Sequence, residues 1–133
     1  MDKPEALDPQ LAQAIVLNAH SNLEKVRELV EQQPKLVNAS WDWGGGDWES
    51  ALGAAAHMGR RDIALYLLEH GARMDLFAAA MLGHVAVVEA ALRAFPGVQN
   101  VPGPHGIPLI AHATAGGEQA TAVLALLESL PSA

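Results

Sequence analysis

Residues 50–72 read SALGAAAHMGRRDIALYLLEHGA, and this stretch decides how the rest of the chain is interpreted. Apolar residues recur at helical spacing on both sides of Gly59, which predicts two short helices that pack against each other. Gly59 would separate the two helices, and Gly71 would end the pair. Because helices this short are unstable alone, the stretch also predicts neighbours built in the same way. The inward-facing positions are Leu52, Ala55 and Ala56 in the first helix and Ile63, Leu67 and Leu68 in the second.

The same pattern returns further along the chain. When the stretch is shifted so that Leu52 falls on Leu76, Gly59 also falls on Gly83, and apolar positions coincide in both helices. Periodic self-similarity of this kind is typical of a solenoid, in which stacked units bury a continuous core. The second copy is marked by Leu76, Ala79, Ala80, Gly83, Val87 and Leu92, the third by Leu109, Ala113, Gly116, Leu126 and Leu127, and a weaker N-terminal copy by Val26, Leu29 and Val30.

These repeats resemble the ankyrin repeat family, whose pattern is T-P-L-H-x-A-A-x-x-G-H-x-x-V-V-x-x-L-L-x-x-G-A. The matching positions include Ser50-Ala51-Leu52, Ala55-Ala56, Gly59, Ile63, Leu67-Leu68, Gly71-Ala72, Ala79-Ala80, Gly83-His84, Val87-Val88, Leu92, Pro108-Leu109, Ala113 and Gly116. No copy keeps the His of T-P-L-H, because Gly53, Phe77 and Ile110 stand there. The resemblance implies an all-α, ankyrin-type α-solenoid of about four helix-turn-helix repeats, shortened in places and with irregular hairpin loops. We expect a single domain over residues 1–133, with approximate repeats at 8–38, 47–74, 75–100 and 105–130.

Local signals predict where several helices begin. Asp8 precedes a proline and can act as the N-cap of a first helix that runs to about residue 19. Ser21 and Glu24 have the spacing of a capping box for the second helix. Ser50 and Asp75 stand at the N-cap positions of two later helices. Asp75 follows the preceding pair so closely that no hairpin fits between the two.

Composition excludes several classes of partner. The 133 residues carry 8 basic and 15 acidic side chains, and the net charge of −7 opposes binding to nucleic acid. No apolar run approaches the ~18 residues that a membrane span requires. The chain has no cysteine, which removes disulfides, thiolate metal ligands and thiol nucleophiles. We therefore expect a cytoplasmic protein that binds neither nucleic acid nor membrane.

All three tryptophans lie in the connection at residues 38–49, which also holds three consecutive glycines. In the ankyrin family this connection forms a β-hairpin finger at the edge of the concave face, and glycines supply the turn. One interpretation is that Trp41 and Trp43 fold back over the first repeats. The other is that at least one tryptophan stays exposed as an anchor for a partner protein, beside Asp42, Asp47 and Glu49. A second connection, at residues 98–106, is rich in proline and glycine, which predicts a stiff loop or a short finger.

The two residues before each repeat glycine lie on the concave face in the ankyrin family. Here they align with His57-Met58, Met81-Leu82 and Thr114-Ala115, and more loosely with His20-Ser21. The resemblance therefore implies an exposed apolar strip made by Met58, Met81 and Leu82, with Trp48 at its margin. The alternative is that these side chains pack against one another or against the loops.

Catalytic and metal-binding patterns are weak in this sequence. The six histidines include no pair at the i, i+4 spacing of a helical zinc site. No serine stands in a G-x-S-x-G elbow, and no G-K-[ST] follows the triple glycine. A cluster of Asp47, Glu49 and His57 as general acid and base remains an alternative. We predict no catalytic residue, no metal ligand and no cofactor.

These observations favour a non-catalytic scaffold for protein–protein interaction. Its concave face and tryptophan-bearing finger would bind a partner protein, whose identity the sequence does not indicate. Two alternatives are a homo-oligomerisation module, with the chain a monomer or a weak homo-oligomer, and a small-molecule or metal-dependent enzyme that uses a His/carboxylate cluster. The predicted partner-binding residues are Trp41, Trp43, Asp47, Trp48, Glu49, His57, Met58, Met81 and Leu82.

Overall fold

The computed structural model describes residues 3–131, so the outermost residues of the predicted 1–133 domain lie outside the described part. Within residues 3–131 the chain is mostly helical, as predicted, and one small antiparallel sheet is its only sheet. The α-helices are α1 (Pro9–Asn18), α2 (Leu23–Gln32), α3 (Ala51–His57), α4 (Arg61–Glu69), α5 (Leu76–Leu82), α6 (Val85–Ala94), α7 (Leu109–Ala115) and α8 (Thr121–Glu128). The strands are β1 (Ser40–Asp42) and β2 (Trp48–Ser50), and short 3-10 segments are η1 (Pro34–Asn38), η2 (Val98–Asn100), η3 (Pro104–Gly106) and η4 (Gly117–Ala120).

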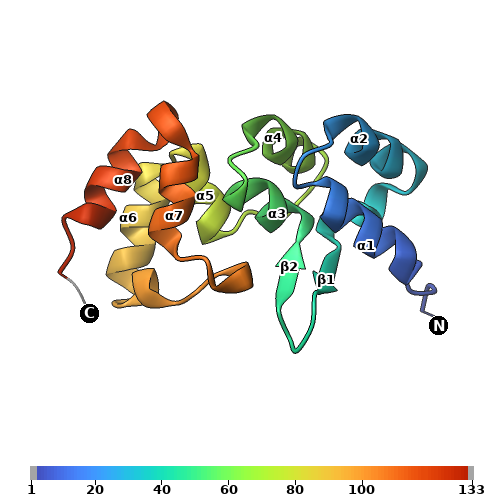
Figure 1. The fold of residues 1–133 in the computed structure, drawn as a ribbon, viewed down its shortest axis with the longest axis horizontal. Helices are drawn as coiled ribbons and strands as arrows, with labels where there is room; N and C mark the ends of the chain where they lie inside the picture. The colour runs from blue at the N-terminus through green and yellow to red at the C-terminus, as the bar shows by residue number, and fades with distance from the viewer. Residues whose placement is uncertain (1–2, 132–133) are drawn as a thin grey trace.

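The helices pack in consecutive pairs, α1 with α2 through to α7 with α8 (Figure 1). The first helices of the pairs form one layer, in which α3 packs on α1 and α5, and α5 packs on α7. In the other layer α2 packs on α4 and α6 packs on α8, whereas α4 makes its onward contact with α5. Helix α5 therefore joins the first two pairs to the last two.

Buried apolar side chains form two clusters that divide at α5. The first cluster lies among α1, α2, η1, α3 and α4, and also takes Ala78, Met81 and Leu82 from α5. The second cluster lies among α6, α7 and α8, and takes Ala79 and Ala80 from the other side of α5. None of the helices within residues 3–131 is long and apolar enough to cross a membrane.

Most of the predicted helix starts are confirmed. Asp8, Ser50 and Asp75 each accept a hydrogen bond from a backbone N–H in the first turn of the following helix. The predicted capping box at the start of α2 is wrong, because Asn22 rather than Ser21 is the N-cap. The turn after α1 extends through Ser21, so the backbone reaches the N-cap geometry one residue later.

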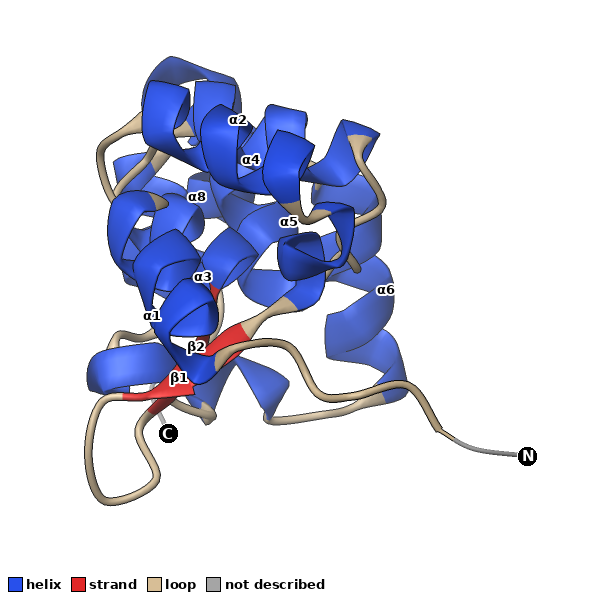
Figure 2. Cartoon of the chain, turned by 90° about the vertical axis from the view of Figure 1, so that its right-hand side faces the viewer, coloured by secondary structure: helices blue, strands red, loops and turns tan. Residues whose placement is uncertain are grey.

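The predicted β-hairpin at the first connection is confirmed. Strands β1 and β2 pair in antiparallel register, with Trp41 opposite Glu49 and Asp42 opposite Trp48. The turn residues Gly44 to Gly46 all have positive φ, and the Asp42 carboxylate accepts hydrogen bonds from two of their backbone amides. The hairpin projects from the edge of the helical layers (Figures 1 and 2). Successive side chains of a strand point to opposite faces, so β2 buries Glu49 while it exposes Trp48.

Candidate functional site

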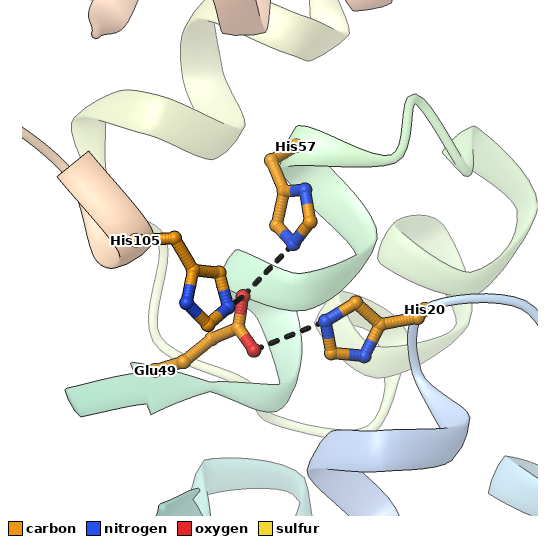
Figure 3. Close-up of side chains that lie close together, drawn as sticks. All are labelled: His20, Glu49, His57 and His105. Carbon is orange, nitrogen blue, oxygen red and sulfur yellow. Dashed lines mark ion pairs between the residues drawn. The ribbon is translucent and has the colours of Figure 1, made fainter. Parts of the chain in front are cut away.

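Three histidines surround one buried glutamate beside the base of the hairpin, a group that we call the histidine–glutamate cluster (Figure 3). The Glu49 side chain is fully buried. Its Oε1 atom lies 3.1 Å from Nε2 of His20, and its Oε2 atom lies 3.0 Å from Nε2 of His57 and 3.2 Å from Nε2 of His105. Three imidazoles therefore present the same ring nitrogen to a single carboxylate.

The four side chains of the cluster come from four separate segments of the chain. His20 lies in the turn after α1, Glu49 is the central residue of β2, and His57 ends α3. His105 lies in η3, within the connection between α6 and α7. The stacking of α1 against α3 and the contact of η3 with β2 bring these segments together.

Asp47 holds His105 in place through two hydrogen bonds. The backbone N–H of His105 donates to Oδ1 of Asp47 at 2.8 Å, and the His105 ring Nδ1 lies 2.6 Å from Oδ2. His105 is the one non-glycine residue with positive φ in residues 3–131, at 60°. A left-handed conformation costs a non-glycine residue about 1–2 kcal/mol, so its neighbours must hold it there.

The ring protons of two of the histidines can be assigned from their partners. His20 Nδ1 lies 2.9 Å from the carbonyl oxygen of Leu17, which can only accept, so this nitrogen carries the proton. His105 Nδ1 faces the carboxylate of Asp47, which also only accepts when ionised. In their neutral forms both rings therefore direct the lone pair of Nε2 at Glu49, whose oxygens are themselves acceptors.

The Glu49 carboxylate is only partly satisfied. Trp43 donates its indole N–H to Oε1 at 2.9 Å. Within the described residues, the buried Oε2 atom accepts no hydrogen bond, although two imidazole nitrogens lie close to it. The buried Nε2 atom of His57 is likewise without a hydrogen-bond partner there. Unsatisfied buried polar atoms cost free energy, so these two atoms mark a place where a binding partner would be favourable.

The surroundings of His57 and His105 shift the pKa values of these two residues in opposite directions. Burial lowers the pKa of His57, and although the Glu49 charge opposes this, the charges of the neighbouring histidines add to it. Burial would also lower the pKa of His105, but its hydrogen bond with Asp47 and the charges of Glu49 and Asp47 outweigh burial and raise this pKa. The pKa of Asp47 is lowered, first by the hydrogen bond from the backbone of His105. The cluster thus favours an ionised Asp47 and a neutral His57.

The donor set and its spacing suit a tetrahedral metal ion. Zinc binds imidazole nitrogen and carboxylate oxygen at about 2.0–2.1 Å, which places neighbouring ligand atoms about 3.3 Å apart. The three contacts of Glu49 with the imidazoles are close to this spacing, and all four ligand atoms lie within 4.8 Å of one another. The bonds that Nδ1 of His20 and of His105 make are the outer contacts that orient metal-binding histidines.

A second surface feature lies on the hairpin. The Trp48 side chain is 61% exposed, and Trp41 and Trp43 are partly buried against the first cluster of the core. The prediction that Trp41 and Trp43 fold back is therefore confirmed, and Trp48 stays exposed, whereas its role as an anchor for a partner protein stays a prediction. Trp48 borders a mainly apolar hollow of about 370 Å³ that is lined by Pro9, Ala12, Ser40, Trp41, Asp42 and Trp48.

The predicted apolar strip on the concave face is wrong. Met81 and Leu82 are 1% and 3% exposed, so they are buried in the core and cannot form an exposed strip. Met58 is 49% exposed and stands without its two expected neighbours. The reason is that both side chains pack into the first cluster of the core, which α5 shares with the first two helix pairs.

The remaining predicted site residues gather in and around the cluster. Glu49 and His57 are in direct contact, and Asp47 joins them through His105. Sequence patterns missed His20 and His105. One signal was present for His20, because it aligns with His57 at the end of a first helix. His105 lies in an irregular loop, where spacing gives no indication of its neighbours.

The connection at residues 98–106 is a loop with two 3-10 segments and no strand, so it brings His105 to the cluster without a second hairpin. Every side chain of the cluster therefore comes from regular structure or from a short turn. The chemistry of these side chains is the main guide to what the site binds. A scan of protein-family models and a search of curated protein sequences gave no significant match to this chain.

Proposed function

We propose that this protein binds a divalent transition-metal ion, with Zn²⁺ as the best fit, through His20, Glu49, His57 and His105. The observation that carries the proposal is the buried Oε2 atom of Glu49, which has two imidazole nitrogens within 3.2 Å and accepts no hydrogen bond. Ligand atoms that bind the same metal ion lie close together without forming hydrogen bonds to one another, as these atoms do. A cation among the four ligand atoms would satisfy all of them together.

Protonated imidazoles would satisfy the buried Glu49 carboxylate less well than a metal ion would. Glu49 carries a single negative charge, and one of its oxygens already accepts a hydrogen bond from Trp43. Three imidazolium rings around it would repel one another, and although the pKa of His105 is raised, that of the buried His57 is lowered. A metal ion requires neutral imidazoles and an ionised carboxylate, which fits the lone pairs that the rings present.

The donor types select the class of metal. Three imidazole nitrogens and one carboxylate suit zinc and its neighbours, whereas magnesium and calcium prefer shells made of oxygen. Four protein ligands would complete a tetrahedron, as in structural zinc sites, whereas catalytic sites keep a position open for water. We therefore assign the metal a structural role and propose no reaction.

We further propose that the domain is a shortened ankyrin-type solenoid. Four consecutive helix pairs, a hairpin before the second pair and glycines between paired helices support this family assignment. The metal site would then be an addition at the places where the ends of first helices and the connecting loops meet.

Isothermal titration calorimetry of the chelator-treated protein tests the proposed function. We expect one equivalent of Zn²⁺ to bind, and His57→Ala and Glu49→Gln to weaken binding at least tenfold while circular dichroism shows unchanged helicity. His84→Ala is the matched control, because His84 is exposed and lies outside the cluster. Absence of zinc binding, or equal weakening by the control, would refute the proposal.

Trp48 supports a second candidate function, a scaffold that binds a partner protein at the hairpin. Its exposed indole lies beside the apolar hollow, and tryptophan is enriched at interaction hot spots. Trp48→Ala should abolish capture of a partner, whereas Phe95→Ala should not, because Phe95 is an equally exposed aromatic residue on another part of the surface. Equal effects of the two substitutions would contradict this assignment. A self-association role predicts instead that sedimentation reports a dimer that Trp48→Ala dissociates.

A further inference from the structure

The two halves of the helical stack meet at α5, at a direct contact of α3 with α7 and at the contact of η3 with β2. The first cluster of the core belongs to the pairs α1–α2 and α3–α4, and the second belongs to α6, α7 and α8. Helix α5 has seven residues and divides its apolar side chains between the two clusters. In stacked repeats, cooperative unfolding depends on the interfaces between neighbouring units. Because each half has a buried cluster of its own, the two halves can unfold separately unless the contacts between them couple their unfolding.

The histidine–glutamate cluster crosses this division. His20, Glu49 and His57 belong to the first half, whereas His105 lies in the connection between α6 and α7, in the second half. Segment η2 of that connection packs on α6 and α7, and segment η3 packs on β2. The hydrogen bonds between Asp47 and His105 are the polar link at the point where η3 meets the hairpin. An ion in the cluster would bind ligands from both halves at once.

We propose that the metal ion links the second half of the stack to the first half. The metal-bound domain then unfolds as one unit, whereas the two halves of the metal-free domain unfold separately. This inference rests on the proposed metal site and adds a role for the ion. With the ion bound, separation of the halves requires loss of a coordination bond from His105. Without it, the contact of η3 with the hairpin depends on the partly exposed pair of Asp47 and His105. Ligand binding to the native state alone stabilises that state, and here the stabilisation would be shared across the division.

The tryptophans allow the two halves to be followed separately. All three lie between residues 41 and 48, in the first half, so their fluorescence reports mainly on that half, although the Trp43 ring also lies 6.5 Å from the ring of His105. Far-ultraviolet circular dichroism reports on helices of both halves. Urea unfolding measured by the two signals should give coincident curves in the zinc-loaded protein. In the chelator-treated protein the two curves should separate, with different midpoints.

Two matched variants distinguish a link between the two halves from general stabilisation of the fold by a bound ion. Each of His20→Ala and His105→Ala removes one imidazole, but only His105→Ala removes the ligand from the second half. At saturating zinc, the curves of His20→Ala should still coincide, whereas those of His105→Ala should separate. Hydrogen exchange at the amides of Gly103, Gly106 and Ile107 should slow on zinc binding in His20→Ala but not in His105→Ala.

Several outcomes would overturn the inference, and they differ from failure of the metal site itself. Coincident curves in the chelator-treated protein would show that the contacts between the halves couple their unfolding without the ion. Separated curves in the zinc-loaded protein, or identical behaviour of the two variants, would show that the ion does not link them. Each of these results is compatible with zinc binding in the calorimeter. Absence of zinc binding would refute the proposed function and this inference with it.

Discussion

The Nδ1 atom of His105 lies 2.6 Å from the Oδ2 atom of Asp47, and the other oxygen of that carboxylate accepts the backbone N–H of His105. One carboxylate thus fixes both the position and the ring orientation of a residue whose backbone is left-handed. The opposite ring nitrogen faces Glu49 at 3.2 Å. Asp47 is therefore a positioning residue for the histidine–glutamate cluster, and it does not itself need to touch a bound ion.

Asp47→Asn tests this positioning role. The substitution removes the charge that orients the ring but leaves all four proposed ligands in place. Outer contacts of metal-binding histidines typically contribute about 10–100-fold to affinity, so we expect zinc binding to weaken by roughly that factor. Asp62→Asn is the control, because Asp62 forms a surface pair with Arg60. Unchanged affinity in Asp47→Asn, measured by calorimetry, would show that the contact does not orient His105.

In the metal-free protein, the pKa values of His57 and His105 should lie on opposite sides of the ordinary histidine value of about 6.5. The midpoint for His105 should be raised and that for His57 lowered, and NMR of the imidazole C–H signals against pH measures both. A raised pKa stabilises the fold below about 6.5, and this stability is lost as pH rises through the folded value. A lowered pKa acts in the opposite sense, because stability is lost as pH falls from about 6.5 through the folded value. Two midpoints on the same side would contradict the described geometry.

Zinc affinity should fall as the solution is acidified. Metal binding needs neutral imidazoles, so protons compete with the ion at each nitrogen. The raised pKa of His105 makes this residue the first of the two to become protonated as pH falls. Calorimetry in buffers of different ionisation enthalpy should also detect proton release on zinc binding. An affinity that is constant between pH 8 and pH 5.5 would contradict the use of histidine ligands.

Met81 and Met58 should respond differently to truncation. Met81→Ala removes a buried side chain from the core and should cost about 2–5 kcal/mol of unfolding free energy. Met58→Ala changes a half-exposed side chain and should cost within about 0.5 kcal/mol. Urea unfolding of the zinc-loaded variants measures the difference. Similar costs would mean that Met81 is more exposed than the structure shows.

Alanine substitutions at Gly83 and at Gly97 should destabilise the protein to different extents. Both have positive φ, near 84° and 90°, so alanine is strained at either position. At Gly83 a Cβ atom would also collide with the backbone oxygen of Gln119, whereas the space around Gly97 is open. Gly97→Ala should cost about 1–2 kcal/mol from backbone strain alone. Gly83→Ala should cost more, and equal costs in urea unfolding would contradict the close packing of α5 against η4.

Much of the helical architecture could be predicted because its causes are local. The pair α3 and α4 follows from apolar spacing on either side of Gly59, and the N-caps at Ser50 and Asp75 from short polar side chains. The hairpin followed from family resemblance and from glycines that tolerate positive φ. These features depend on residues that are neighbours in the sequence.

The sequence indicates Asp47, Glu49 and His57 as a candidate cluster, but the complete group could not be predicted because its causes are not local. The side chains at positions 20, 49, 57 and 105 meet only after helix pairs stack and a loop crosses from one half to the other. The burial of Met81 and Leu82 has a similar origin, because it depends on how closely α5 packs on the preceding helix pairs. Apolar spacing places a residue on a helix face, but it does not tell which neighbour covers that face.

X-ray absorption spectroscopy at the zinc edge, on the complex with one equivalent of zinc, tests the central claim most directly. The account predicts four ligands at about 2.0–2.1 Å, with multiple scattering from three imidazole rings and one further oxygen. His84→Ala should leave this spectrum unchanged, and His105→Ala should remove one imidazole from it. A shell of six oxygens, or fewer than three imidazoles in the wild-type complex, would contradict the account.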